Sequence, residues 1–334
     1  MSVPSNDPIF ENSGWLGRLY LSIHKRNYQK RLARQATFPD KRIISLGNLS
    51  AGGTGKTPLG QHLLQVAVDR GYSAAVLLRG YGGRASKSGG LVFDGHRSLM
   101  GSSESGDEAQ LYRISGARTI IGRDRVDSIR RFAADCNFLI LDDCFQNPTV
   151  RRDLDIVLID ATVPVNRARL LPLGRFREPL EALQRASCVI LSRADQDSQG
   201  ALDWHRAIQH RFPELPIIQA SHEAGPVSPP LPAGSRVLAV SGIGNPAGFE
   251  RSLQEAGFGL ADRIRYSDHH SFTMKEILGW QRGLPVVTTE KDLVRIDDAL
   301  KAYYGAKKPI RIKGLHTLPV RMAPDGLEKI VFGK

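Results

Sequence analysis

From residue 41 onward, short apolar runs alternate with longer segments in which apolar residues recur every three or four positions. Short apolar runs between polar residues are typical of buried strands, and the 3.6-residue recurrence is typical of amphipathic helices. The predicted strands of this first part are 43–47, 74–78, 119–121, 138–141, 156–159 and 189–191, and the predicted helices are 58–70, 107–115, 126–134 and 202–211. Strands that alternate with helices predict an α/β fold with a parallel sheet covered by helices on both faces.

A segment rich in Pro and Gly, residues 224–235, interrupts this pattern and is typical of a linker. Further predicted strands follow it at 237–240, 263–266 and 286–288. A length of 334 residues agrees with two domains. We therefore predict an N-terminal segment at 1–35, a larger α/β domain at 36–223, the linker, and a smaller α/β domain at 236–334.

Residues 14–35 carry six Lys or Arg and no Asp or Glu. Leu16, Leu19, Tyr20 and Ile23 recur at helical spacing, with Trp15 beside them. This pattern predicts a basic amphipathic helix that lies on an anionic membrane surface. The alternative is a terminal helix that packs on its own domain and exposes a solvated basic face.

Composition narrows the class of protein only a little. The net charge of +12 favours polyanionic partners, which include nucleic acid, anionic lipid and phosphorylated substrates. Three cysteines without a CxxC pair agree with a reducing compartment. Neither a signal peptide nor an apolar run of membrane-spanning length is evident. We expect a cytosolic protein, or one that lies on a membrane without crossing it.

The strongest chemical signal is the run GNLSAGGTGKTP at 47–58, between a predicted strand and a predicted helix. This context is that of a phosphate-binding P-loop, in which glycines let backbone N–H groups approach phosphate oxygens and the helix N-terminus adds positive charge. The predicted nucleotide-binding residues are Gly52, Gly53, Thr54, Gly55, Lys56 and Thr57. Lys56 would reach the β- and γ-phosphates, and the Thr57 hydroxyl would bind Mg²⁺. One departure from the general pattern is Ser50, which stands where a Gly is expected.

A second signal is the apolar run 138–141, which ends in Asp142 and Asp143. A carboxylate at the end of a strand beside a P-loop is the usual anchor for Mg²⁺. Two other acidic motifs are weaker when taken alone. Asp107 lies in a Gly-Asp-Glu run at the start of a predicted helix, where acids also serve as caps. The Thr-Glu-Lys-Asp run at 289–292 is by default a solvated charge cluster.

The Asp268-His269-His270 run lies in the predicted smaller domain. A histidine there is more often structural than catalytic. An Asp beside a His could nevertheless form a base whose proton affinity is raised by the carboxylate.

Taken together and in order, these motifs resemble the tetraacyldisaccharide 4′-kinases, the membrane-associated lipid A kinases of Gram-negative bacteria. The resemblance covers most of the chain, from Gly47 to Asp292. It rests on the P-loop run, LRGYG at 78–82, GDE at 106–108, DD with FQ at 142–146, LPLGRFREP at 171–179, SDHH at 267–270 with Phe272, and TEKD at 289–292.

The resemblance implies a P-loop kinase that transfers the γ-phosphate of ATP, with Mg²⁺, to the 4′-hydroxyl of a tetraacyldisaccharide 1-phosphate. It also implies two α/β domains around a cleft and a peripheral or monotopic position on the cytoplasmic face of the inner membrane. Partners are then the anionic glycolipid and the membrane surface, with no nucleic acid and no obligate protein partner. The implied catalytic residues are Lys56, Asp107, Asp268 and His269, the implied metal site is Thr57, Asp142, Asp143 and Glu178, and Gln146 and Arg177 line the same cleft.

Two residues depart from the family pattern after the paired aspartates. Cys144 stands in place of a Gly, so a tight turn is expected to differ in shape. Asn147 stands in place of a His and cannot carry a proton charge near neutral pH. We expect both changes to affect substrate contacts more than nucleotide binding.

The mechanism expected is one of positioning and charge neutralisation. Asp107 would accept the proton of the sugar hydroxyl, assisted by Asp268 and His269 from the smaller domain. Candidate clamps for a substrate phosphate are Arg79, Arg84 and Arg123.

Two other classes of protein remain as alternatives. A regulatory P-loop GTPase is suggested by the run LSRAD at 191–195, although Ser192 and Arg193 replace the Asn and Lys of a guanine-reading motif. A nucleic-acid-binding protein is suggested only by the positive charge, with no recognition motif to support it.

Overall fold

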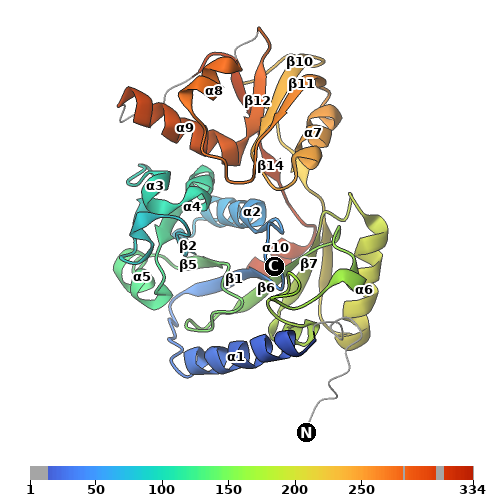
Figure 1. Cartoon of the computed structure of the whole chain (residues 1–334). Coiled ribbons are helices and arrows are strands. Elements are labelled where there is room, and N and C mark those ends of the chain that lie inside the picture. The colour runs from blue at the N-terminus through green and yellow to red at the C-terminus, as the bar shows by residue number, and fades with distance from the viewer. Residues whose placement is uncertain (1–13, 281–282, 306–311, 334) are drawn as a thin grey trace.

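The computed structural model describes residues 14–280, 283–305 and 312–333, and two α/β units stand one above the other in it (Figure 1). The larger unit holds eight strands: β1 Arg42–Asn48, β2 Ala74–Leu78, β3 Gly90–Phe93, β4 Arg118–Ile121, β5 Phe138–Asp142, β6 Leu154–Asp160, β7 Cys188–Ser192 and β8 Ile217–Ala220. They form one sheet in the order β3-β4-β2-β5-β1-β6-β7-β8. Every neighbouring pair is parallel except β3 with β4. This is the doubly wound architecture that the alternating pattern predicts, and the predicted fold class is confirmed.

The strand interiors of the larger sheet are buried on both faces because successive side chains point to opposite sides. In β1, Ile44 and Leu46 join one apolar core cluster, whereas Ile43 joins another. The helices of this unit are α1 Gly14–Leu32, α2 Lys56–Asp69, α3 Ser102–Ser105, α4 Asp107–Leu111, α5 Arg125–Phe132, α6 Ser198–Arg211 and α10 Leu327–Phe332. Short 3₁₀ turns lie at Arg84–Ser86, Tyr112–Ser115, Val165–Arg167 and Leu180–Arg185.

The smaller unit has a parallel sheet of its own, with the strand order β11-β10-β12-β13. Its strands are β10 Arg236–Ser241, β11 Gly259–Arg265, β12 Val286–Thr289 and β13 Leu315–Leu318, and its helices are α7 Pro246–Glu255, α8 Met274–Gly279 and α9 Glu290–Tyr304. Helix α9 packs against α3 and α4 of the larger unit. The carboxyl ends of β10 and β12 therefore face the larger unit, as Figure 1 shows.

The chain passes between the two units twice, and the two passages pair with each other. The short strands β9 Glu223–Ala224 and β14 Val320–Arg321 form an antiparallel ribbon. After β14 the chain returns to the larger unit, where Leu327 and Val331 of α10 are fully buried in its core. The sequence pattern placed all of 236–334 in the smaller unit. The structure instead makes that unit an insertion, because α10 completes the apolar face under β5.

The Pro- and Gly-rich segment after β9 is packed rather than extended away from the protein. Ser228 and Thr317 exchange backbone hydrogen bonds of 2.9 and 2.7 Å, so the segment lies along β13. Val227 is buried in a core cluster of the smaller unit. The proposed boundary at 235/236 thus falls inside a region already attached to the smaller sheet.

Most predicted elements are confirmed, but the sequence pattern missed the two ribbon strands β9 and β14 and three strands of the parallel sheets. Both β3 and β8 are four-residue edge strands of the large sheet, and β13 is the four-residue edge strand of the small sheet. Each is too short to show a period, and glycine or proline lies next to each in the sequence.

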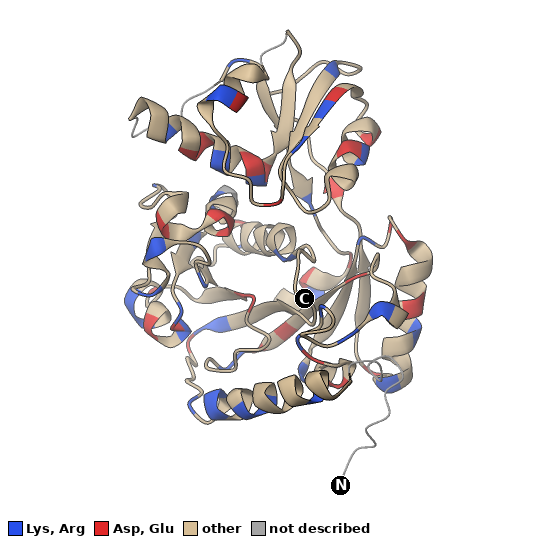
Figure 2. Ribbon diagram, in the orientation of Figure 1, with Lys and Arg blue, Asp and Glu red and all other residues tan. Residues whose placement is uncertain are grey.

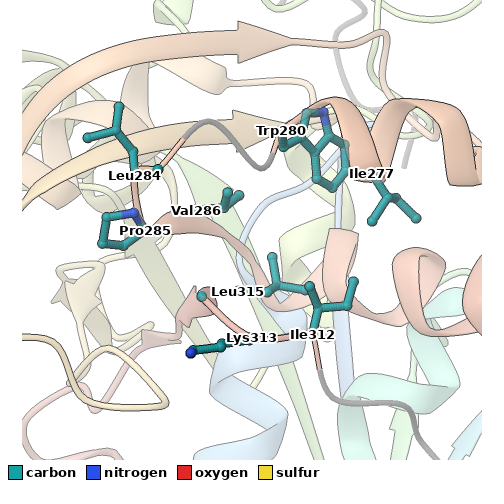
Figure 3. A pocket seen from close by; sticks show the side chains of 10 residues that line it. Ile277, Trp280, Leu284, Pro285, Val286, Ile312, Lys313 and Leu315 are labelled. Atoms are coloured by element: carbon teal, nitrogen blue, oxygen red, sulfur yellow. The ribbon is translucent and has the colours of Figure 1, made fainter.

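An apolar hollow of about 380 Å³ lies in the smaller unit, next to the beginnings of β12 and β13 (Figure 3). Trp280 and Ile277 line one side, and Val286 and Leu315, the first residues of β12 and β13, line another. Because parallel strands begin at one edge and end at the other, this hollow is separate from the edge that faces the P-loop. None of the residues predicted to be catalytic lines it.

Candidate active site

The P-loop connects β1 to α2 as the sequence predicts. Gly52 and Gly55 have φ of +124° and +90°, in the region that favours glycine, and Lys56 is the first residue of α2. A Cβ at position 55 would lie 2.6 Å from His222 Nε2 and from Met322 Cε. Glycine is therefore required at Gly55 for its backbone conformation and for the close approach of the two ribbon passages.

The remainder of the loop is held by neighbouring segments. Asn48 Nδ2 lies 3.3 Å from both Gly52 O and Thr54 Oγ1, and Ala51 N donates to Arg175 O at 2.7 Å. Ser50, the departure from the usual pattern, forms an isolated β-bridge and has no positive φ. A serine is thus compatible with this loop because the left-handed positions fall two residues or more later.

The paired aspartates at the end of β5 lie beside the P-loop lysine. Lys56 Nζ is 3.5 Å from Asp143 Oδ1, and Arg177 NH1 lies 3.0 Å from both oxygens of the same carboxylate. Asp142 is buried behind them and accepts a hydrogen bond of 3.1 Å from the Tyr112 hydroxyl. The structure thus brings together two sequence motifs that are separated by about 85 residues.

The two aspartates differ in electrostatic environment. Burial raises the pKa of Asp142 to about 7; the carboxylates of Glu108 and Asp143 add to the rise, and Lys56 opposes it. Burial also acts to raise the pKa of Asp143, but Lys56 and Arg177 outweigh it and hold that pKa below its ordinary value. Asp142 is therefore the carboxylate whose burial is not offset by the nearby cation.

The residues present fit a Mg²⁺ ion at this position. Asp142 Oδ1 is buried and has no hydrogen-bond partner, so a carboxylate oxygen next to the P-loop is left unsatisfied. Within the described part of the chain no cluster of three acidic, His or Cys ligands could hold a metal by itself. Such a shortage is typical of Mg²⁺ in nucleotide sites, where one or two protein oxygens act with phosphate oxygens and waters.

Glu178, the fourth metal ligand expected from the resemblance, is bound to several partners. Both of its oxygens accept hydrogen bonds from Arg185, at 3.0 and 2.9 Å, and His24 Nε2 of α1 is 3.1 Å away. Gln146 Nε2 lies 3.1 Å from the same carboxylate and 2.8 Å from the carbonyl of Asn48 at the start of the P-loop. Burial acts to raise the pKa of Glu178, but His24 and Arg185 together lower it. Glu178 thus joins the first helix to the P-loop.

Asp107 is the first residue of α4, directly after a glycine that the turn requires. Gly106 has a φ of +81°, and a Cβ there would clash with the carbonyl oxygen of Tyr81. The Gly-Asp-Glu and Leu-Arg-Gly-Tyr-Gly motifs therefore occur together because their backbones pack against each other. The two acids of α4 interact with different neighbours. The Glu108 carboxylate raises the pKa of Asp142, whereas the Asp107 carboxylate pairs with Arg295 of the smaller unit.

The smaller unit brings His269 to Asp107, as the sequence predicts. His269 Nδ1 is 3.8 Å from Asp107 Oδ2. The expected Asp268-His269 pair is looser, since His269 Nε2 and Asp268 Oδ2 are 3.9 Å apart, and the backbone N–H of His269 donates to Asp268 Oδ1 instead. His269 has a φ of +62°, in the left-handed region that residues other than glycine seldom adopt. The next residue, His270, stacks on Tyr266 and is structural.

The interpretation of 289–292 as a solvated charge cluster is wrong. Thr289 caps α9 by accepting a hydrogen bond from Asp292 N, and Asp292 is fully buried. The carboxylate of Asp292 accepts from Gly242 N at 3.0 Å and from Arg295 at 3.1 Å. This motif therefore fixes the loop after β10, and its buried acid is balanced by a buried arginine.

Sequence reasoning missed two arginines at this site. Arg295 on α9 donates to Asp107 Oδ2 at 2.7 Å. Arg193, after β7, forms an ion pair with Asp160 and donates to the P-loop carbonyl of Gly53 at 2.9 Å. The spacing of Arg295 three residues after Asp292 was a usable signal, since residues at i and i+3 share one face of a helix.

The three arginines that the sequence suggested as phosphate clamps are exposed, and all follow the ends of β2 or β4. They are Arg79, Arg84 and Arg123. In parallel strands these ends share the edge that carries the P-loop. Their position is compatible with contact to a bound phosphate.

The first of the two departures after Asp143 is explained by local geometry, whereas nothing in the structure explains the Asn147 side chain. The left-handed residue of the turn is Asp143, with φ of +50°, so position 144 has no need of glycine. Cys144 is buried in an apolar cluster, and Asn147 N donates to its carbonyl at 2.8 Å to close the turn. The expectation that Cys144 reshapes the turn therefore has no support in the backbone.

Comparison with known proteins agrees with this arrangement. A family model described as tetraacyldisaccharide-1-P 4'-kinase matches residues 9–331. The tetraacyldisaccharide 4'-kinase of Chlorobium limicola is 34% identical over 311 residues, covering 86% of this chain and 87% of the relative. That of Anaeromyxobacter dehalogenans strain 2CP-1 is 37% identical over 291 residues, covering 81% and 76%. The structure of LpxK from Aquifex aeolicus in complex with ATP aligns with a TM-score of 0.73 and 25% identity, over 94% of this chain and 95% of that one.

Proposed function

The chain belongs to the tetraacyldisaccharide-1-P 4'-kinase family and is an ATP-dependent kinase, and we propose that the residues meeting between its two units carry out the transfer. The γ-phosphate of ATP goes to the 4′-hydroxyl of a tetraacyldisaccharide 1-phosphate. The resemblance inferred from the ordered motifs is confirmed. The kinase family therefore replaces the two alternative classes, a regulatory GTPase and a nucleic-acid-binding protein.

In our proposal the P-loop edge binds the nucleotide. The backbone N–H groups of 52–57 and the Lys56 ammonium bind the β- and γ-phosphates. Thr57 and Asp142 would hold Mg²⁺, which when bound would neutralise negative charge at the nucleotide phosphates. The unsatisfied oxygen of Asp142 supports this assignment. Two further carboxylates orient the cations of the site through ion pairs. Asp143 pairs with Lys56 and Arg177, and Glu178 pairs with Arg185.

The acceptor hydroxyl loses its proton to Asp107. The observation that supports this role is the position of Asp107 next to Glu108, whose carboxylate raises the pKa of Asp142, and opposite His269, which belongs to the other unit. A disaccharide bound between the units would place its hydroxyl against this carboxylate. His269 and Asp268 supply a polar wall on the acceptor side.

The test is transfer from γ-labelled ATP to detergent-dispersed tetraacyldisaccharide 1-phosphate. For the Asp107→Asn variant we expect kcat to fall by about 10²- to 10⁴-fold, the range of general-base catalysis, with ATP affinity within about threefold of wild type. Asp127→Asn, which removes an exposed acid on α5 that pairs with Arg131, is the matched control. Near-normal turnover of Asp107→Asn would contradict the base assignment.

We also propose that α1 docks the enzyme on the cytoplasmic face of the inner membrane, where its lipid substrate resides. The outward face of α1 carries exposed Trp15, Leu19 and Ile23, and Figure 2 shows basic residues and no acidic one along the helix. The inward face carries Leu21, which packs on the core of the larger unit, and His24. The packed inward face agrees with the alternative of a helix that rests on its own domain, and the exposed outward face is the surface that we propose for docking. Among the described helices none has the length and apolarity to cross a bilayer.

Deleting residues 1–35 is a poor test of docking, because it also removes His24 from Glu178. Changing Trp15, Leu19 and Ile23 together to Gln leaves that contact in place. We expect sedimentation with phosphatidylglycerol vesicles to weaken by about tenfold or more, since each side chain loses on the order of 1–2 kcal/mol of apolar burial. Leu202→Gln on α6 is the control, and unchanged sedimentation of the triple variant would rule out docking through this face.

A further inference from the structure

Arg295 is a buried arginine that connects the two units at the proposed catalytic base. Its side chain is only 6% exposed, although α9 lies at the surface between the units. Its Nε donates to Asp107 Oδ2 at 2.7 Å, whereas the nearest nitrogen of His269 is 3.8 Å from the same oxygen. The closest cationic neighbour of Asp107 from the other unit is therefore Arg295 and not His269.

The rest of the guanidinium is fixed within the smaller unit. NH1 donates to Gly242 O at 3.0 Å and to Asp292 Oδ1 at 3.1 Å, and Asp292 is itself fully buried. An arginine presents its donors in a rigid planar fork, so fixing NH1 also sets the direction of Nε and NH2. The donor that reaches Asp107 is thus oriented by contacts that do not involve the larger unit.

NH2 of the same group lies 3.2 Å from His269 Nδ1. A guanidinium can only donate, so Nδ1 must accept and cannot carry a proton while this contact exists. The neutral imidazole then carries its proton on Nε2, the nitrogen that faces away from Arg295. One side chain therefore sets both the orientation of Asp107 and the tautomer of His269.

We propose that Arg295 is a positioning residue for phosphoryl transfer. It acts by fixing the side chains of Asp107 and His269 relative to each other across the interface between the units. The inference rests on the proposed role of Asp107 as the base. Arg295 occupies Oδ2 of Asp107 and so directs Oδ1 to the acceptor hydroxyl. It touches neither nucleotide nor sugar, and its effect is on the rate of transfer.

The experiment compares Arg295→Met and Arg295→Lys with wild type in the lipid transfer assay. We expect kcat to fall by about 100-fold for Met and about tenfold for Lys, which keeps the charge but loses the fork, with KM for ATP within about threefold. Arg263→Met, which removes an exposed arginine from its ion pair with Glu250 in the same unit, should leave kcat unchanged. A kcat for Arg295→Met within threefold of wild type would overturn the inference.

A double-mutant cycle separates positioning from a merely structural role. If Arg295 acts through Asp107, Arg295→Met should cause little further loss of kcat in the Asp107→Asn background. An equal loss in both backgrounds would show that Arg295 acts independently and would overturn the proposal. If Asp107→Asn itself turns over normally, the base assignment fails, and this result is distinct from a failure of Arg295.

The tautomer of His269 provides a second readout that needs no turnover. In ¹⁵N-histidine-labelled protein near pH 8, we expect the His269 ring to show the Nε2–H tautomer in wild type and to lose that preference in Arg295→Met. The His269→Gln variant assigns the signal. The same tautomer distribution with and without the guanidinium would contradict the proposed contact.

Discussion

Two edges of parallel sheets face each other in this protein, and they are built in different ways. The edge of the larger sheet carries its chemistry in contiguous motifs: the P-loop follows β1, and the paired aspartates end β5. At the edge of the smaller sheet, the contributing residues come from separate segments. Its contribution comes from His269 in a loop after β11 and from Arg295 on α9, which converge on an acid that belongs to the other unit.

The difference teaches which part of the reaction each edge can support alone. In our proposal, nucleotide binding depends on backbone N–H groups and a lysine that one strand-loop-helix segment supplies. Acceptor activation would depend on Asp107, whose partners lie about 160 to 190 residues away in sequence. Damage at the first edge should therefore remove ATP binding and transfer together, whereas damage at the second should remove transfer alone.

The largest expected effect is that of Lys56→Met. The variant keeps the length of the side chain but removes the charge that meets the phosphates, so we expect transfer to fall by more than about 10³-fold and ATP affinity to weaken as well. Equilibrium binding of a fluorescent ATP analogue, beside the transfer assay, measures both. Lys329→Met on the exposed side of α10 is the control. Undiminished ATP binding by Lys56→Met would contradict the proposal that the edge of the larger sheet binds the nucleotide.

A smaller effect is expected at the opposite edge. For His269→Ala we expect kcat to fall by about 10- to 100-fold, because a polar group facing the acceptor is lost, while the dissociation constant of ATP stays within about threefold. The same pair of assays gives the answer. Weakened ATP binding in this variant would mean that the smaller unit takes part in holding the nucleotide.

The smallest effect concerns stability. The pKa of Asp142 is raised from 3.8 to about 7 in the folded protein, so the unfolded chain releases this proton at lower pH. The ligand-free protein should thus lose stability as pH rises from about 4 to about 7 and change little from this group above that. Asp142→Asn removes the penalty, and we expect its Tm to exceed that of wild type by a few degrees at pH 8.

Thermal unfolding at two pH values checks this prediction. The stability gain at pH 8 should be on the order of 1–3 kcal/mol, since each pKa unit corresponds to about 1.4 kcal/mol, and it should shrink at pH 5.5. Mg²⁺ with ATP should stabilise wild type more than the variant. A gain that is equal at both pH values would show that the buried charge is not its cause.

The sequence predicted the nucleotide edge well because its signals are local. Gly52, Gly55 and Lys56 are read from one short run, and the strand before them is apolar. The fold class followed for the same reason, since strands and helices alternate with clear periods. The short edge strands β3, β8 and β13 were missed because four residues do not establish a period.

The acceptor edge could be predicted only in part. Asp107, Asp268 and His269 came from a family resemblance, which names residues but gives no geometry. Arg295 was missed because its role depends on the packing of α9 against α4, which no single segment encodes. The burial of Asp292 was misjudged for the same reason: a charged run appears solvated until the loop after β10 is placed against it.

Helix α10 has a consequence for how the protein is made. Because Leu327 and Val331 belong to the core of the larger unit, this core stays open during synthesis until the whole inserted unit has left the ribosome. The rings of Phe138 and Tyr72, which pack against Phe332, are then transiently exposed to solvent and are expected to bind chaperones. A premature stop just before Leu327 would leave every catalytic motif translated, yet the nucleotide-binding unit would lack the helix that closes it.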